Sequence, residues 1–567
     1  MIRVRPGPQG VPLLAAAGAA TLLAACLPQQ APAQDTAVVS GVTTHFAQGW
    51  PPRLLPQAKV LGAGMIRDSV HWPAVERAPG LYAFTPVNSG HVDRACAAGL
   101  KVMLGLEPRN PLYDGGNTVW SAPAQLAFAR YVAVVAGRWP GCVVAIEIGN
   151  EINGKGGMTG PAARDRIGTH VALLRAVRLA AKPDHPHLAL LGGSTNALPV
   201  GFLTRLFRAG ALDAVDGIAV HPYRAQPEGV ERELARLSAA MTAAGRTVPV
   251  WVTEFSRAFA RPEEAASFYL KMIALMEGAG VRRHLWYALA DQPGFAALGL
   301  VRFDGTEKPA GRAFGFAART LAPAGPAERV DHGDPTLYDY RFGSAVRVVW
   351  GARRPMDAQP TGPEPVRYYR ADGTEIAALT SVQDEPVVIT GVRTLRFGPT
   401  EVIADSLYGF AQAPLSWSAQ STGGASIPLA WVDWQWNGYL GAASQPRAAV
   451  TPLGMAVAPG FDTIVRWTSP ARTVVFASAC LAAQPGESSP VRIAIAHAGR
   501  AAWSSTLSGG LGTAMVRLPV EPGDTVDLVT AAGGGPPTRI AYRWRIATSG
   551  DEPAPCPSLP GMETPQP

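Results

Sequence analysis

The chain has 567 residues, and it is poor in charge, in cysteine and in long apolar runs. Charged residues make up only 16%, and no cluster of Lys and Arg is interleaved with aromatic residues, although the formal net charge is +7. This argues against a nucleic-acid partner. The five cysteines show no C-x-x-C spacing and the histidines no H-x-x-x-H spacing, so we expect no metal and no cofactor. Beyond the first residues, no stretch reads as a membrane-spanning helix.

Two families of catalytic motif are also missing. No G-x-G-x-x-G follows the first predicted strand, and Gly149 with Gly154-Lys155 only imitates a phosphate-binding loop. Gly156 stands where Ser or Thr would hold magnesium, and Glu151 inside the stretch would repel phosphate. No G-x-S-x-G is present, so a serine esterase is unsupported.

The N-terminus has the pattern of a secretion signal. Arg3 and Arg5 precede an apolar run that ends in Leu23-Ala24-Ala25-Cys26, which predicts a signal peptide over residues 1–25. The last four residues resemble the bacterial lipobox, which implies a lipid on Cys26, followed by a tether over 26–37. Leu27, rather than Asp, fits sorting to the outer membrane. We therefore expect a cell-envelope lipoprotein that faces the periplasm or the exterior.

Export bears on the four remaining cysteines, because disulfides persist outside the cytoplasm. Cys480 and Cys556 both lie in the C-terminal region and could form a disulfide that holds its tail in place. Cys96 and Cys142 lie earlier, and they are either paired or buried as free thiols.

Between residues 38 and 325, short apolar runs alternate with amphipathic helical stretches, such as those at 122–139, 161–181 and 261–279. This alternation predicts βαβ units. Eight such units match the length of a (β/α)8 TIM barrel in the α/β class better than an open doubly wound sheet. The expected strands are Val39–His45, Gly62–Arg67, Lys101–Leu106, Val143–Gly149, Leu188–Gly193, Gly217–Val220, Val248–Thr253 and His284–Ala288.

After the barrel the sequence becomes rich in short strands. We expect a small β-sandwich over residues 326–401, a C-terminal β-rich domain of sandwich or jelly-roll type over 402–550, and a disordered tail over 551–567. A strand is predicted at Trp431–Tyr439, where Trp434 and Trp436 would share one face. They would fill the core of the sandwich or form an exposed platform for sugar rings, as in a carbohydrate-binding module.

Polar residues that follow the apolar strands indicate where chemistry occurs, because active sites lie at the C-terminal ends of barrel strands. Glu151 follows the fourth strand, and Glu254 lies at the end of the seventh. Burying a carboxylate that has no dedicated partner is costly, so two such glutamates indicate a function. Glycoside hydrolysis requires two carboxyl groups that face each other across a gap the size of a sugar ring. Neighbouring negative charge would keep one of them protonated as the acid.

Asn150-Glu151 and Thr253-Glu254 resemble the two signatures of clan A retaining glycoside hydrolases. The stretch from Arg67 to Phe84, with R-D-S-x-x-W and P-G-x-Y-x-F, is similar to family 39, which includes β-xylosidases and bacterial exopolysaccharide hydrolases. The resemblance covers residues 38–320 and, more loosely, the sandwich that follows.

The resemblance implies roles for individual residues. Glu151 would be the acid/base, Glu254 the nucleophile, and Asn150 the partner of a sugar 2-hydroxyl. Trp286 would place its aromatic ring beneath the sugar. Arg67, together with Tyr223 or His221, would orient Glu254. Each has a structural alternative: Arg67 could pair with Glu147 or Asp68, and His221 and Trp286 could be core residues. Trp72, with His45, His71, Glu107 and Asn110, is a further candidate for substrate contact.

Together these patterns predict an anchored, retaining hydrolase of a polysaccharide, with a bacterial exopolysaccharide as the expected substrate and the export machinery as a possible partner. Two alternatives remain open at this point. One is a non-catalytic polysaccharide-binding or secretion-scaffold lipoprotein, and the other is a transglycosylase that uses the same residues.

Overall fold

A computed structural model describes residues 37–557, except 260, 293, 295–296, 364, 422–423, 484–486 and 488. The signal peptide, Cys26 and almost all of the tether lie outside the described residues, as does the end of the C-terminal tail. Within the described part, no helix is both long and apolar enough to cross a membrane.

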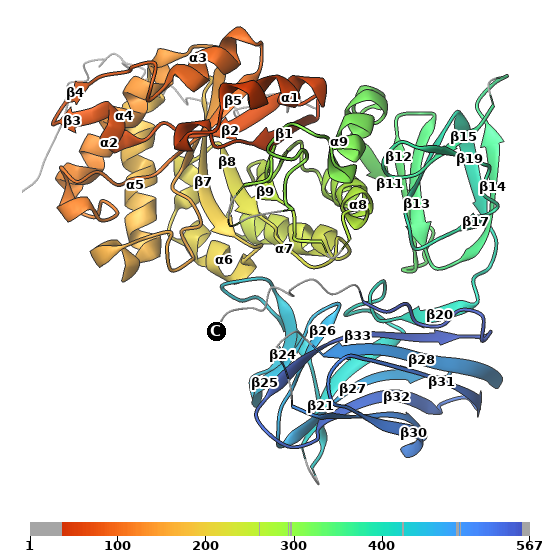
Figure 1. The fold of residues 1–567 in the computed structure, drawn as a ribbon. Coiled ribbons are helices and arrows are strands. Elements are labelled where there is room, and N and C mark those ends of the chain that lie inside the picture. Colours follow the sequence, from red (N-terminus) through yellow and green to blue (C-terminus); the bar gives the residue numbers. More distant parts are fainter. Residues whose placement is uncertain are drawn as a thin grey trace, which may run out of the picture. The chain divides into compact units, whose positions relative to one another are not determined.

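The first half of the chain is a closed barrel of eight parallel strands, which confirms the predicted TIM barrel. The strands pair in the order β1-β10-β9-β8-β7-β6-β5-β2, with helices on the outside (Figure 1). The barrel strands are β1 Val39–Thr43, β2 Met65–Asp68, β5 Lys101–Leu106, β6 Val143–Ile148, β7 Ala189–Asn196, β8 Gly217–His221, β9 Val250–Phe255 and β10 Arg283–Trp286. Each overlaps its predicted range, with ends displaced by up to three residues.

Two of the longer helices begin at residues that are usual start signals. Pro123 lies in the first turn of α4, and the side chain of Asp165 caps α5 by accepting a hydrogen bond from the Gly168 N–H. The helices are α1 Leu55–Val60, α2 Trp72–Val75, α3 Gly90–Ala97, α4 Ala122–Arg138, α5 Arg166–Ala181, α6 Val200–Arg208, α7 Val230–Ala243, α8 Glu264–Gly278 and α9 Pro309–Thr320. A short hairpin, β3 Glu76–Ala78 with β4 Leu81–Tyr82, follows α2.

A small β-sandwich comes next in the chain. One sheet has the order β11-β12-β13-β18-β15-β16 and the other β17-β14-β19. Trp350, Tyr338 and Tyr340 of this sandwich belong to the same hydrophobic cluster as the barrel, so the two share a core. The strands are β11 Ala327–Arg329, β12 Leu337–Phe342, β13 Val346–Gly351, β14 Arg354–Pro360, β15 Arg367–Tyr369, β16 Glu375–Ile376, β17 Ser381–Val382, β18 Val387–Thr390 and β19 Val392–Phe397.

The C-terminal region is a second, larger sandwich with a core of its own around Trp417, Trp467 and Trp544. Its layers are an eight-stranded and a six-stranded antiparallel sheet, drawn in cyan to dark blue in Figure 1. The strands are β20 Val402–Asp405, β21 Leu415–Ser421, β22 Ser426–Pro428, β23 Ala430–Val432, β24 Tyr439–Ala442, β25 Gln445–Val450, β26 Gly454–Val457, β27 Phe461–Thr468, β28 Thr473–Ala483, β29 Val491–His497, β30 Arg500–Leu507, β31 Leu511–Val520, β32 Thr525–Ala532 and β33 Thr538–Ala547.

Two disulfides are present among the described residues. Cys480 on β28 is joined to Cys556, the pairing that the sequence favours, and it ties the end of the described chain to the sandwich. Cys96 on α3 is joined to Cys142, which decides the alternative left open for these two residues.

One predicted strand is wrong. Residues 431–439 do not run as one strand: β23 and β24 form a hairpin, and residues 433–438 are the loop between them. Trp434 and Trp436 therefore lie neither in the core of the sandwich nor on a strand face. The Asn437-Gly438 pair near the end of the loop favours a turn, which prevails over the strand-like alternation of Trp and polar residues.

Candidate active site

The site is built by the inward-facing side chains of the barrel strands. One interior layer is apolar and consists of Met65, Met103, Ala145, Leu191, Ala219 and Leu285. Successive side chains of a strand alternate between faces, so the residue two positions further on also faces inward, closer to the mouth. At those positions the sequence places Arg67, Gly105, Glu147, Gly193, His221 and Tyr287. The period of the strands thus stacks a charged layer directly on an apolar one.

Glu254 is held by two donors, one on each carboxylate oxygen. Arg67 Nη1 lies 2.5 Å from Glu254 Oε1, and the Tyr223 hydroxyl donates to Oε2 at 2.6 Å. The Glu254 side chain is only 8% exposed. Both oxygens are therefore fixed in position by charge-assisted or hydroxyl hydrogen bonds.

Arg67 connects this carboxylate to two further residues. Its Nε lies 2.7 Å from Glu147 Oε2, and its Nη2 donates to Asn150 Oδ1 at 2.8 Å. Burial alone would raise the pKa of Glu147, but the interactions with Arg67 and His221 together outweigh burial and lower that pKa to about 2. Arg67 thus pairs with Glu147, as the structural alternative held, and with Glu254 as well.

Glu151 is more open than Glu254, with a side chain that is 30% exposed. Its Oε1 accepts a hydrogen bond from Asn196 Nδ2 at 2.9 Å. The backbone of Glu151 is left-handed, with φ of 47°, a conformation that is costly for a residue other than glycine. A Cβ at Gly157 would lie 1.9 Å from the Glu151 carbonyl oxygen, so the following loop closes tightly over this residue. The surroundings therefore hold Glu151 in an unfavourable conformation at the mouth.

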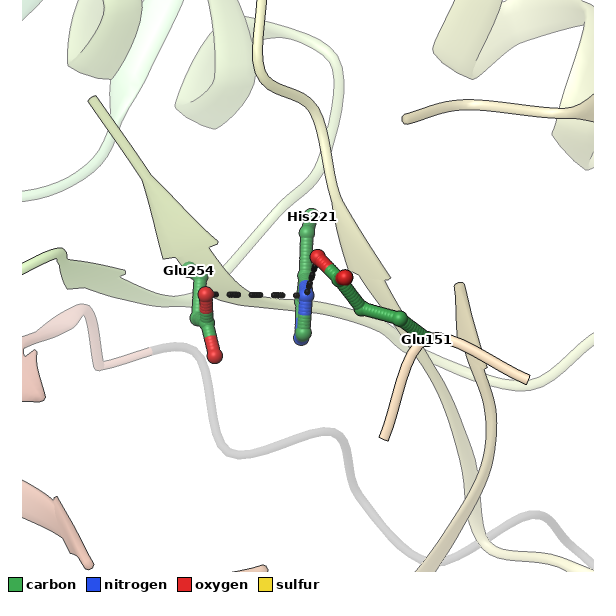
Figure 2. A group of neighbouring side chains, drawn as sticks. All are labelled: Glu151, His221 and Glu254. Atoms are coloured by element: carbon green, nitrogen blue, oxygen red, sulfur yellow. Dashed lines mark hydrogen bonds and ion pairs between the residues drawn. The ribbon is translucent and has the colours of Figure 1, made fainter. Parts of the chain in front are cut away.

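His221 lies between the two glutamates, as Figure 2 shows. Its Nδ1 is 3.3 Å from Glu151 Oε1 and 3.7 Å from Glu254 Oε2, and its Nε2 is 3.6 Å from Glu147 Oε1. Burial lowers the pKa of His221, but the charge of Glu254 and the interactions with Glu147 and Glu151 outweigh burial and raise it to about 9. His221 is therefore a buried cation at neutral pH.

This cation changes the expected electrostatics of Glu151. Burial raises the pKa of Glu151, but the hydrogen bond and the charge of His221, with help from Asn196, outweigh burial and lower it. From the sequence we expected only repulsion between the carboxylates, whereas the structure places a positive charge between them.

Glu151, His221 and Glu254 offer carboxylate and ring atoms that all lie within 4.8 Å of one another, a grouping that could also hold a metal ion. Imidazole binds a metal through the neutral ring, and a histidine with a pKa of about 9 is protonated at neutral pH. The donor set as it stands thus suits an acid/base group better than a metal centre.

Two tryptophans expected at the site are buried elsewhere. Trp286 is fully buried and packs on Phe255 and Tyr269, with its Nε1 donating to the Leu298 carbonyl oxygen. It faces the helices because Leu285, its neighbour, faces the barrel interior. Tyr287 is the aromatic residue of this segment that lines the cavity. The expectation that Trp286 lies under the sugar is therefore wrong.

The expectation that Trp72 contacts the substrate is also wrong, because this side chain is buried away from the cavity. It is 1% exposed, stacks on Tyr113 and Tyr131, and donates from Nε1 to Glu76. Asn110 is buried beside it and donates to the Glu76 carbonyl oxygen. Of the remaining candidates, His45, His71 and Glu107 do line the cavity.

Asn196 and Tyr287 are functional residues that the sequence reasoning missed. Asn196 ends β7 and Tyr287 directly follows β10, so a systematic reading of the polar residues at each strand end could have found Asn196. Counting in steps of two from Leu285 could have found Tyr287.

Two cavities meet at Glu151. The nucleophile cavity, of about 730 Å³, contains Arg67, Glu254 and Tyr287. The loop cavity, of about 740 Å³, contains Lys155, Gln226 and Trp436. Glu107, Asn150, Glu151, Asn196 and Tyr223 line both.

Comparison with known proteins agrees with this arrangement. Residues 200–314, from the start of α6 into α9, match the family model described as glycosyl hydrolase catalytic core. No curated protein matches the sequence. One similar solved structure is a family 39 glycoside hydrolase from Bacteroides cellulosilyticus WH2, with 20% identity over 62% of this chain and 80% of that chain and a TM-score of 0.53.

Two other solved structures are family 39 proteins. A β-xylosidase from Caulobacter crescentus has 18% identity over 63% of this chain and 96% of that chain, with a TM-score of 0.46. An enzyme from Xanthomonas axonopodis pv. citri has 13% identity over 88% of this chain and 95% of that chain, with a TM-score of 0.43. At such identities a likeness is one of fold.

Proposed function

Because this chain is a glycoside hydrolase, with its catalytic core on a (β/α)8 barrel, we propose that it cleaves a polysaccharide with retention of anomeric configuration. One observation carries the proposal. Carboxylate oxygens of Glu151 and Glu254 lie within 4.8 Å of each other across one cavity, close to the separation of about 5 Å typical of retaining enzymes. An inverting enzyme would need a wider gap to admit a water molecule.

In the first step Glu254 attacks the anomeric carbon. A bond forms between a Glu254 oxygen and that carbon, the glycosidic bond breaks, and Glu151 gives its proton to the leaving oxygen. Arg67 and Tyr223 hold Glu254 in position before the sugar arrives. The side-chain oxygen of Asn150 already accepts a hydrogen bond from Arg67. The side-chain nitrogen of Asn150 is therefore the group that can donate to a sugar hydroxyl.

In the second step water hydrolyses the glycosyl-enzyme. Glu151 takes the proton from the water, the new bond to carbon forms, and Glu254 is released as a carboxylate. The 30% exposure of the Glu151 side chain is consistent with a group that must reach both a leaving sugar and a water molecule.

We further propose that the substrate is a bacterial exopolysaccharide and that the enzyme acts from the cell envelope through a lipid on Cys26. The Leu-Ala-Ala-Cys sequence, the two disulfides and the appended sandwiches support an exported enzyme. Polysaccharide export machinery is the partner expected in that setting.

The test measures reducing ends released from a panel of β-linked polymers. Glu254→Ala should lower the rate by about 10⁴-fold or more, because it removes the nucleophile. Glu328→Ala is a suitable control, since Glu328 is an exposed glutamate on β11 that pairs with Arg341 and lies outside both cavities. Equal product from the wild type and Glu254→Ala would overturn the catalytic assignment.

Azide separates the two glutamate roles on an activated aryl β-glycoside. In Glu254→Ala, azide should replace the nucleophile and give the α-glycosyl azide. In Glu151→Ala, it should attack the glycosyl-enzyme and give the β-glycosyl azide. The opposite pair of products would reverse the assignment.

A further inference from the structure

We propose that the loop at residues 433–438 of the C-terminal sandwich forms a wall of the leaving-group site, with Trp436 as its contact to the sugar. This rests on the proposed function. The large sandwich would then be part of the active site of the barrel, rather than an independent carbohydrate-binding module.

The position of the leaving group follows from the positions of the two glutamates. Glu254 bonds to the anomeric carbon, so the sugar that is retained occupies the nucleophile cavity. Glu151 protonates the bridging oxygen, so the leaving sugar lies on the far side of Glu151 from Glu254. The loop cavity begins at Glu151 and does not include Glu254 among its lining residues. It therefore has the position that a leaving sugar needs.

Trp436 has features of a ligand contact. Its side chain is half-buried and lines the loop cavity. Among the described residues, the enclosed indole Nε1–H meets no hydrogen-bond partner. A buried donor without a partner is costly, and a sugar hydroxyl or ring oxygen would satisfy it. A Cβ at Gly154 would lie 3.9 Å from Trp436 Cη2, so the ring faces the loop that follows Glu151.

The loop is fastened to the barrel on both sides of Trp436. Asn437 Oδ1 accepts from the Leu198 N–H at 3.0 Å, and Asn437 Nδ2 donates to the Tyr223 carbonyl oxygen at 3.3 Å. Asn153 Nδ2 donates to the Gln435 carbonyl oxygen at 3.1 Å. The loop is thus held by the segments that follow β6, β7 and β8.

A second attachment lies at the start of the loop. Arg236 on α7 makes two hydrogen bonds to the Asp433 carboxylate, at 3.1 and 3.2 Å, and its guanidinium lies 5.0 Å from the centre of the Trp431 ring. Trp431 Nε1 also donates to Asp433 Oδ1 at 2.8 Å. These contacts give the loop one defined position, as a binding wall requires.

The experiment separates the leaving-group site from the chemistry. A panel of 2-deoxy-2-fluoro-β-glycosyl fluorides (xylosyl, glucosyl and galactosyl) traps the glycosyl-enzyme. Their leaving group is a fluoride ion, which occupies none of the loop cavity. Oligosaccharides from the cleaved polymer then act as acceptors and release the trapped enzyme. Trapping reports the nucleophile cavity, and release by an acceptor reports the loop cavity.

We expect Trp436→Ala to be trapped at the wild-type rate and to be released about tenfold more slowly by oligosaccharide acceptors, from loss of a hydrogen bond and a packed ring. Trp436→Phe keeps a ring but not the N–H and should fall between the two. Trp434→Ala is the matched control, since Trp434 lies in the same loop, packs on Tyr439 and lines neither cavity.

Each outcome decides something different. Failure of every fluoride to trap the wild type would overturn the proposed function and this inference with it. Trapping of the wild type with equal acceptor release from Trp436→Ala would overturn the inference alone. An equal loss in Trp434→Ala would show a general effect on the loop and would also overturn the role of Trp436.

Discussion

His221 is the residue that controls the charge of the site. It places one positive charge among Glu147, Glu151 and Glu254 in a fully buried position, together with the nearby Arg67. Three carboxylates this close would repel one another strongly without these cations. The same charge lowers the pKa of Glu151, the group that must carry a proton when the glycosidic bond breaks.

This arrangement predicts the pH dependence of kcat/KM, which reports the free enzyme. A lowered pKa means that the protonated form of Glu151 is lost at acid pH, so kcat/KM should fall as the pH rises through that range. His221→Asn removes the cation that stabilises the Glu151 carboxylate. The pKa of Glu151 should then rise, and the alkaline limb of the profile should move to higher pH.

Profiles from pH 3 to 8 provide the measurement, because His221, with a pKa of about 9, stays protonated throughout that range. His187→Asn, a change at an exposed histidine after α5, should leave the limb in place. A limb that stays in place, or moves to lower pH, in His221→Asn would contradict this account of Glu151.

At the scale of the strand, the period of two explains both what the sequence predicted and where the prediction was wrong. The eight apolar runs identified the barrel strands, and the polar residue after each run located Glu151 and Glu254. Choosing Trp286 over Tyr287 ignored the direction of the side chains. Leu285 faces the interior, so Trp286 must face the helices and Tyr287 the interior.

The two aromatic neighbours on this segment should therefore respond oppositely to mutation. Trp286→Phe removes buried volume and the bond to Leu298, and should lower the free energy of unfolding by about 1–3 kcal/mol with little change in kcat/KM. Tyr287→Ala opens the nucleophile cavity and should lower kcat/KM by about tenfold or more, with a smaller effect on stability because the ring is half-buried.

Denaturant unfolding and kinetics on one polymer measure the two effects. A loss of kcat/KM in Trp286→Phe that exceeds the loss in Tyr287→Ala would contradict this assignment of faces.

At the scale of the molecule, the contacts hardest to derive from sequence join distant segments. Asn437 is 239 positions from Leu198, and no local sequence pattern predicts the hydrogen bond between them. The same holds for His221, whose neighbours Glu147 and Glu151 lie on and after a different strand. Periodicity and strand ends locate a site on a barrel, but they do not report what a later domain adds to its mouth.

The sandwiches also differ in how they join the barrel. The small sandwich shares one hydrophobic cluster with the barrel. The large one has a core and a disulfide of its own, and it contributes only Leu407 and Tyr408 to the buried residues of the barrel cluster. Separate cores unfold as separate units more readily than a shared one. We therefore expect the large sandwich to unfold in a transition of its own while the barrel keeps its structure.

This leads to a prediction for the disulfide between Cys480 and Cys556, which are 76 positions apart. Replacing both cysteines by alanine should lower the free energy of unfolding of the large sandwich by about 4 kcal/mol, because the unfolded chain gains the freedom of a long loop. Calorimetry should show an earlier transition for that sandwich and an unchanged one for the barrel.

Between these two transitions the loop at 433–438 is no longer held, but the barrel still presents Glu151 and Glu254. Hydrolysis of an aryl glycoside, whose leaving group is small, should then persist while cleavage of the polymer is lost. Replacing Cys96 and Cys142, which join α3 to the residue before β6, should instead destabilise the barrel and reduce both activities together. Parallel loss of both activities in the Cys480 and Cys556 variant would show that the large sandwich supports the whole barrel rather than one side of its active site.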